Sequence, residues 1–125
     1  MNGYSVEIAE SSKELSAKER IKLKDTSDAI KLDEITATEK EVLITPVAYA
    51  VLNIHNEKSD NKDYKNYIIE DESGTKYVTG SESFWSTFEN IYSEMKDESE
   101  AWQIKAYRLP SKNYNGKEFL TCSIV

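Results

Sequence analysis

The sequence predicts a small, mainly β fold with one internal helix, and three observations lead to this expectation. Five stretches after residue 41 alternate or run apolar in the manner of strands, one stretch between the third and the fourth repeats at helical spacing, and turn signals separate them. With 125 residues, one Cys and one His, the chain has the composition of a single domain that can bury a core without disulfides.

The first 40 residues are polar, and we interpret them as an N-terminal extension with a short helix, placed before a domain that spans residues 41–125. Ser16 and Glu19 match a capping box, which predicts a helix that ends near Lys24. A short strand is predicted earlier, from the alternation of Tyr4, Val6 and Ile8.

Three strands are predicted at the start of the main domain. Residues 42–54 are apolar and β-branched, which favours a long strand that bends near Pro46. A polar loop over residues 55–63 follows. Strands are then expected at residues 64–70 and 75–79, because Gly74 can take the positive φ that closes a short hairpin between them.

A helix and two more strands complete the predicted order. Gly80 ends the third strand, and Ser81 or Ser83 is expected to cap the helix. Its apolar stripe has spacings of four, three and four, and we assign it to the core: Phe84, Phe88, Ile91 and Met95. The last strands are expected at residues 102–108 and 118–124, joined by a basic loop over residues 110–117 that carries an Asn-Gly turn signal.

This order, β-β-β-α-β-β, is that of the five-stranded OB barrel, although other small α+β folds share it. The fold class predicted is therefore a mainly β (β+α), five-stranded OB-like barrel with an N-terminal extension. Alternation places Leu120 and Cys122 on a core face of the last strand. A closed barrel would show solvent a row of rings on the opposite faces: Tyr49, Tyr77, Tyr107 and Phe119.

Charge is unevenly distributed along the chain, whose net charge is −7. Residues 1–40 carry −2, residues 41–100 carry −8 and residues 101–125 carry +3. The acidic balance argues against indiscriminate attraction to phosphates. In the basic segment, however, aromatic residues alternate with Lys and Arg. Rings offer a stacking surface to unpaired bases and cations follow the sugar-phosphate chain, so this combination favours single-stranded nucleic acid.

Catalysis is not expected. A lone His55 and a lone Cys122 supply no thiolate zinc site and no nucleophile–base pair, and no phosphate-binding glycine loop occurs. His55 has no patterned partners, and Cys122 has the parity of the core. We therefore expect no cofactor and no metal. With no leader and no apolar run near 20 residues, a cytoplasmic protein without membrane association is predicted.

The element order, the polar loop over residues 55–63 and the final hairpin resemble the OB-fold single-stranded DNA-binding proteins of phages and conjugative elements. The resemblance covers residues 41–125. It implies non-catalytic binding and protection of single-stranded DNA during replication, recombination or transfer of a mobile element. The strand faces and two loops would hold the DNA through Tyr49, Lys62, Tyr64, Lys65, Tyr77, Lys105, Tyr107, Arg108, Lys112, Tyr114, Lys117 and Phe119.

The sequence departs from that family in ending on the predicted strand Leu120 to Val125, where bacterial members usually have a disordered acidic tail. Recruitment of replication proteins would then fall to residues 1–40. The partners considered are single-stranded DNA, with RNA left open, replication proteins and a second copy of the chain. The alternative hypothesis is a small acidic interaction module or inhibitor that uses residues 41–100, in mimicry of nucleic acid, to bind a basic protein.

Overall fold

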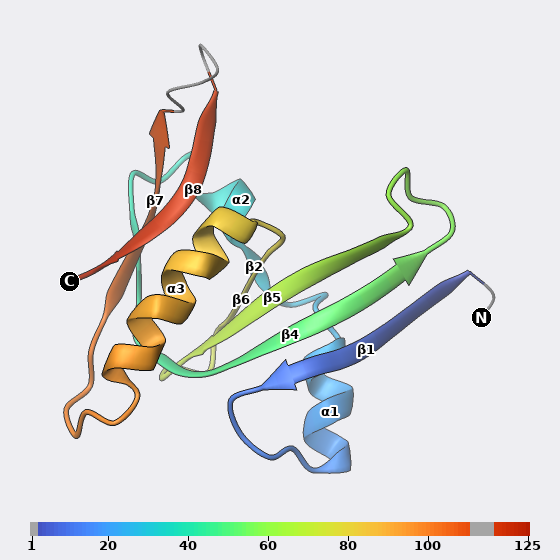
Figure 1. Cartoon of the computed structure of the whole chain (residues 1–125), viewed down its shortest axis with the longest axis horizontal. Helices are drawn as coiled ribbons and strands as arrows, with labels where there is room; N and C mark the ends of the chain where they lie inside the picture. Colours follow the sequence, from blue (N-terminus) through green and yellow to red (C-terminus); the bar gives the residue numbers. More distant parts are fainter. Residues whose placement is uncertain (1–2, 111–116) are drawn as a thin grey trace. The chain divides into compact units, whose positions relative to one another are not determined.

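The computed structural model describes residues 3–110 and 117–125. It is a mixed α/β structure with 44% strand and 22% helix, so strands predominate as predicted. Figure 1 labels the elements in chain order. Their bounds are β1 Tyr4–Ser11, α1 Ala17–Lys24, β2 Ile30–Lys31, α2 Leu32–Ile35, β3 Val42–Ile44, β4 Pro46–Asn56, β5 Asp63–Asp71, β6 Lys76–Thr79, α3 Glu82–Met95, β7 Ile104–Pro110 and β8 Glu118–Ile124.

The strands form two open sheets, one in the order β1-β4-β5-β6-β2 and one in the order β3-β7-β8. No closed barrel is detected among the described residues, so the expected single five-stranded barrel is replaced by this division. The first reason is that residues 42–56 form two strands, separated at Thr45, which belong to different sheets. The second is that residues 1–40 supply β1 and β2, the two edge strands of the larger sheet.

The chain also divides into two compact units. The first unit consists of Met1–Ile30 and Val47–Gly80, and the second of Lys31–Pro46 and Ser81–Val125. Each unit is therefore built from two separate stretches of the sequence. The following paragraphs treat each unit by itself.

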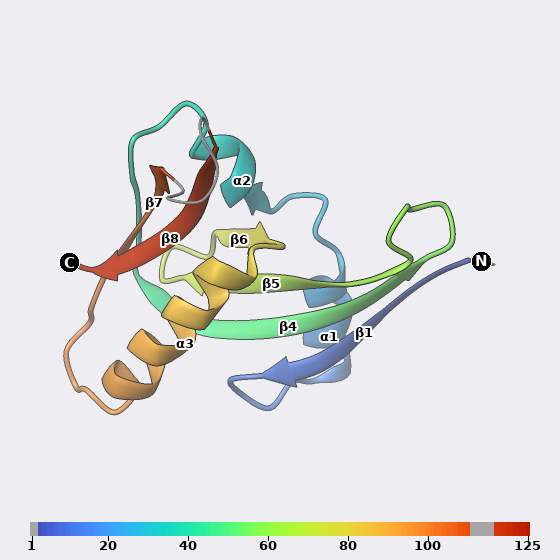
Figure 2. The same ribbon diagram turned by 45° about the horizontal axis from the view of Figure 1, so that its top comes forward.

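In the first unit, α1 covers one face of the sheet that Figures 1 and 2 show as β1, β4 and β5. Leu23 of this helix packs into a buried cluster with residues from one face of the strands. These residues are Ala50, Leu52, Ile54, Ile68 and Val78. The capping box predicted at its start is present, because Ser16 Oγ accepts from the Glu19 amide and Glu19 Oε1 accepts from the Ser16 amide. The β5–β6 hairpin closes at Gly74, whose φ is +89°.

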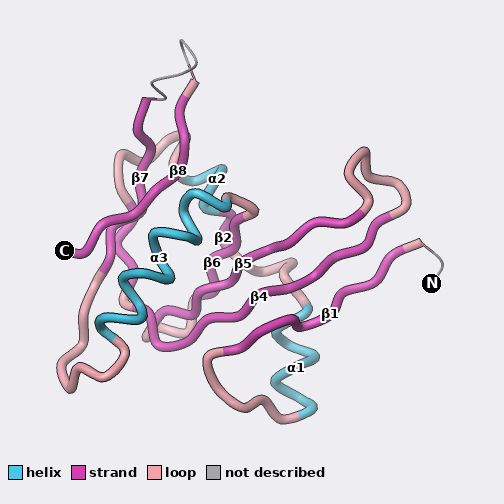
Figure 3. The backbone as a smooth tube through the Cα atoms, in the orientation of Figure 1, coloured by secondary structure: helices cyan, strands magenta, loops and turns pink. Residues whose placement is uncertain are grey.

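In the second unit, α3 runs alongside β8, as Figure 3 shows. Ser81 is the cap of this helix, with its side chain accepting from the Phe84 amide, while Ser83 Oγ donates to the Leu120 carbonyl of β8. The apolar stripe packs as predicted at Phe84 and Phe88, which are fully buried, whereas Ile91 and Met95, also expected in the core, are only partly buried. One face of the three-stranded sheet is buried as well: Val42, Ile44, Ile104, Ala106, Leu120 and Cys122.

None of the helices within residues 3–110 and 117–125 combines the length and the apolar content that a membrane span requires.

Candidate nucleic-acid interface

The second unit presents an open sheet face on which an aromatic ring and a cation lie side by side. Antiparallel pairing sets Leu43 opposite Lys105, and Lys105 opposite Ser123. The next residues of that parity are Tyr107, opposite the buried Thr121, and Leu109, opposite Phe119. Successive side chains of a strand point to opposite faces, so these residues share the face that lies opposite the buried one. We call this set the open face: Leu43, Lys105, Tyr107, Leu109, Phe119, Thr121 and Ser123.

Tyr107 is held in place on this face by one contact to its hydroxyl and one to its ring. Its hydroxyl lies 2.6 Å from Ser123 Oγ, and the Lys105 ammonium lies 5.7 Å from its ring centroid. The distance to Lys105 is within the range of a cation–π contact. Phe119 lies on the neighbouring strand β8, two positions before the residue opposite Tyr107, and is 39% exposed. The open face therefore offers an oriented ring, an exposed ring and a cation within one short stretch of sheet.

The neighbouring cation on β7, Arg108, faces the other way and is already engaged. Its Nε donates to Thr36 Oγ1 at 3.0 Å and its Nη2 donates to the Asp33 carbonyl of α2. Both acceptors belong to the second unit. The structure thus places Arg108, expected as a DNA contact, where it anchors α2 to β7.

The predicted site residues of the first unit are less exposed than a row of solvent-facing rings would require. Tyr49 on β4 is half-buried, and its hydroxyl donates to Glu10 Oε1 at 3.0 Å. Tyr64 packs against the buried cluster under α1. Tyr77 on β6 is half-buried, and this burial raises the pKa of its phenol above the usual value.

The lysines that were predicted as DNA contacts are divided between the two units. Lys62 Nζ pairs with Glu57 at 3.1 Å within the loop between β4 and β5, and Lys65 is exposed on β5. Lys117 is exposed just before β8. Lys112 and Tyr114, which were expected to contact DNA from the basic loop, lie outside the described residues. The structure therefore brings Lys105, Tyr107 and Phe119 together on one face, and places Tyr49, Lys62, Tyr64, Lys65 and Tyr77 in the other unit.

A contact that the sequence analysis missed lies in the first unit. His55, at the end of β4, has its Nδ1 at 2.7 Å from Asp63 Oδ1 and its Nε2 at 2.8 Å from Glu57 Oε1. Carboxylates only accept hydrogen bonds, so both ring nitrogens donate and the pKa of His55 is raised, with the Asp63 bond as the largest cause. The signal was present in the sequence, because two residues that flank a hairpin loop face each other.

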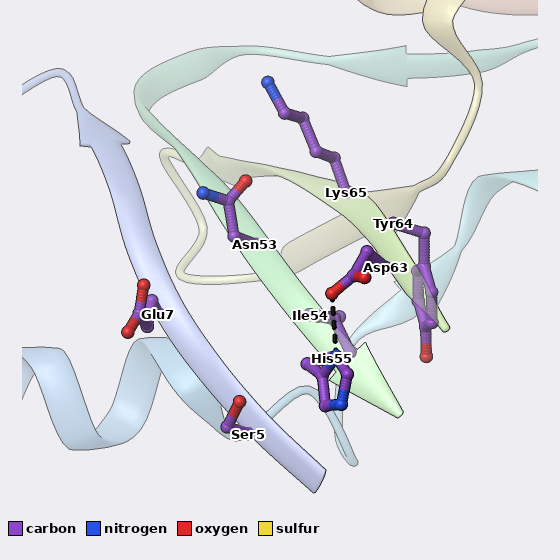
Figure 4. A pocket seen from close by; sticks show the side chains of 8 residues that line it. All are labelled: Ser5, Glu7, Asn53, Ile54, His55, Asp63, Tyr64 and Lys65. Atoms are coloured by element: carbon purple, nitrogen blue, oxygen red, sulfur yellow. Dashed lines mark hydrogen bonds and ion pairs between the residues drawn. The ribbon is translucent and has the colours of Figure 1, made fainter. Parts of the chain in front are cut away.

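This histidine borders a cavity of about 470 Å³ over β1, β4 and β5, drawn in Figure 4 with the His55–Asp63 bond dashed. The cavity is lined by Ser5, Glu7, Asn53, Ile54, His55, Asp63, Tyr64 and Lys65. No group of three or more His, Cys, Asp or Glu side chains in the described ranges is arranged to hold a metal ion. The hydrogen bonds of His55 to Asp63 and to Glu57 accordingly connect the two sides of the β4–β5 loop, and we call this pair of bonds the His55 tie.

Comparison with known proteins adds no relative: no family model matches the chain, and neither a curated protein nor a solved structure matches it.

Proposed function

We propose that the protein binds single-stranded DNA, without catalysing a reaction, through the open face of the β3-β7-β8 sheet. The observation that carries this proposal is the juxtaposition of Tyr107 and Lys105, whose ring centroid and ammonium lie 5.7 Å apart. Tyr107 is half-buried, so only part of its ring is accessible. Unpaired bases stack on an accessible ring with about 1–3 kcal/mol each, whereas bases inside a duplex already stack on one another. The adjacent ammonium, which lies 3.8 Å from Glu41 Oε2, is close enough to contact the phosphate that follows a stacked base.

The topology supports the same proposal. The order β4, β5, β6, α3, β7, β8 is the β-β-β-α-β-β order of an OB-like fold. Residues 42–56 contribute β3, which pairs with β7, to the smaller sheet and β4, which lies between β1 and β5, to the larger one. In the resembling family, the strand faces and two loops, one after the first strand and one between the last two strands, hold the DNA.

The test is a fluorescence-anisotropy titration of a labelled oligo-dT of about 30 nucleotides at low and moderate salt, with a duplex of equal length as comparison. We expect salt-dependent binding that prefers the single strand. Tyr107→Ala removes the ring and should weaken binding at least several-fold. Tyr107→Phe keeps the ring and loses only the Ser123 contact, so it should bind nearly as the wild type does.

Tyr4→Ala is the matched control, because Tyr4 is 45% exposed on a strand of the first unit and is not one of the open-face residues. Its affinity should equal that of the wild type. Failure of the wild type to bind oligo-dT even at low salt overturns the proposal. Equal affinities of folded Tyr107→Ala and wild type would exclude the open face as the DNA-binding site. A parallel titration with oligo-U tests RNA.

A protein partner is the second candidate, and the exposed apolar side chains of the open face favour it. Leu43 is 54% exposed and Leu109 is 41% exposed. Large exposed apolar side chains on one face are typical of protein-binding surfaces. As the sequence analysis proposed, a basic protein would complement the acidic charge of residues 41–100. This candidate predicts no affinity for oligonucleotides at any salt concentration.

A further inference from the structure

A groove of about 720 Å³ runs beside the open face, between the segment that precedes β3 and the strand β7. All of its lining belongs to the second unit. It is lined by Thr38, Glu39, Lys40, Glu41, Lys105, Tyr107 and Arg108. Two of these residues, Lys105 and Tyr107, also belong to the open face, so the groove and the face share a border.

The charge of the lining favours an anion. Three cations line this groove against two carboxylates, although the whole chain carries −7. The cavity of about 530 Å³ beside α1 shows the opposite balance, with four carboxylates against three lysines. A local excess of positive charge in an acidic protein attracts anionic groups to that place and not to the rest of the surface.

The three cations of the groove are not equivalent. Arg108 donates to Thr36 and to the Asp33 carbonyl, so it holds the wall of the groove. Lys40 is an exposed residue of the lining, which the sequence analysis did not single out. Lys105 lines the groove from β7 and forms an ion pair with Glu41, whose Oε2 lies 3.8 Å from the Lys105 Nζ. The side chains of this pair are 40% and 53% exposed, so the pair is weak and readily exchanged.

We propose that the groove binds a backbone phosphate of the strand whose base stacks on Tyr107, and that this phosphate replaces Glu41 as the partner of Lys105. The inference rests on the proposed function. Lys40 supplies the second positive charge that contacts the phosphate. Glu41 lowers the affinity, because its carboxylate must leave Lys105 and then remains close to a second anion. Glu41 thereby lowers the affinity for single-stranded DNA and favours its release.

Glu41→Gln tests this directly, since the substitution removes the charge and keeps the size of the side chain. We expect it to bind oligo-dT about two- to five-fold more tightly than the wild type at low salt. The dependence of log K on log salt should also become steeper, by up to about 0.7, because no freed carboxylate then takes up a cation. Lys40→Gln should weaken binding about two- to five-fold.

Glu94→Gln is the matched control, because Glu94 is exposed on α3, outside the groove lining, and the change in net charge is the same. A gain in affinity that is equal in Glu41→Gln and Glu94→Gln overturns the phosphate subsite, as does no gain in either variant. If these results accompany wild-type binding that still depends on Tyr107, the proposed function stands and the subsite alone fails. If the wild type does not bind oligo-dT, both fail.

Discussion

Lys76 of β6 donates a hydrogen bond to the main-chain carbonyl of Lys22 in the last turn of α1, at 2.9 Å, across 54 positions of sequence. The same ammonium donates to the Asp25 carbonyl at 2.8 Å and lies 3.2 Å from the Asp28 carboxylate. The carbonyls at a helix C-terminus lack partners within the helix and carry partial negative charge. Lys76 therefore closes the end of α1 from the neighbouring sheet.

Removing this ammonium should destabilise the first unit. Lys76→Met keeps the aliphatic stem, and we expect it to lower the free energy of unfolding by about 1–2 kcal/mol, since the side chain is only 15% exposed and its hydrogen bonds are charge-assisted. Urea denaturation followed by circular dichroism measures the change. Lys65→Met, an exposed lysine of β5, is the control and should remain within about 0.5 kcal/mol of the wild type.

The tie at His55 should make stability depend on pH. Hydrogen bonds to Asp63, and then to Glu57, raise the pKa of His55 above its usual 6.5. The unfolded chain titrates near the usual value, so the tie contributes fully below about pH 6.5 and its contribution is lost as pH rises through the folded-state pKa. The His55 bond lowers the pKa of Glu57 from 4.5, so the contribution is also lost at acid pH, when Glu57 takes up a proton.

Proton NMR measures this directly, because the chain contains one histidine. We expect the ring proton of His55 to titrate above pH 6.5 in the wild type and closer to it in Asp63→Asn. A wild-type midpoint at or below 6.5 would contradict the tie.

Arg108 should matter for the order of α2 more than for contact with DNA. Arg108→Met removes both donors to α2 and its C-cap, so we expect a loss of about 1 kcal/mol of stability and faster hydrogen exchange of the Thr36 amide, which donates to Leu32. Arg108→Lys should rescue this only in part, because one ammonium does not reproduce the two-pronged geometry of a guanidinium. Unchanged exchange at Thr36 in Arg108→Met would show that α2 does not depend on this anchor.

Cys122 should be unreactive in the folded protein. It is 3% exposed on β8, and burial raises the pKa of its thiol to about 12. Thiolate is the reactive form, so a disulfide reagent should label the thiol only as fast as the protein opens. The rate in denaturant supplies the reference, and a comparable rate under native conditions would disprove the buried placement.

Elements with local signals were predictable from the sequence. The capping box at Ser16 and Glu19 predicts a helix that ends at Lys24, and α1 ends there. Gly74 predicts the β5–β6 hairpin, and α3 starts from one of its two expected caps, Ser81. In each case the residues that determine the structure lie within a few positions of one another, so the pattern can be recognised without knowledge of the fold.

The division into two sheets was not predictable in this way. Pairing of Ile8 with Leu52 joins β1 to β4 across a long stretch of sequence, and the alternation of β1 does not say which strand edge it will cover. The candidate site shows the same limit. Parity correctly separates Lys105 and Tyr107 from the buried Ala106, but no local pattern reveals that Arg108 reaches Thr36 or that Glu41 reaches Lys105.

The break at Thr45 has a consequence for the order in which the chain is assembled. Every segment of the first unit precedes Ser81, so a ribosome can deliver that unit whole while β7 and β8 are still unmade. Until then β3 has no strand to pair with, because Val42 pairs with Ala106 of β7, which has not yet been synthesised. Closing such distant pairs is slow because the entropy lost on closing the long loop between them is paid before the contacts form. We therefore expect nascent chains to form the N-terminal sheet first while β3 is still unpaired, and the open face to be the last part of the protein to form.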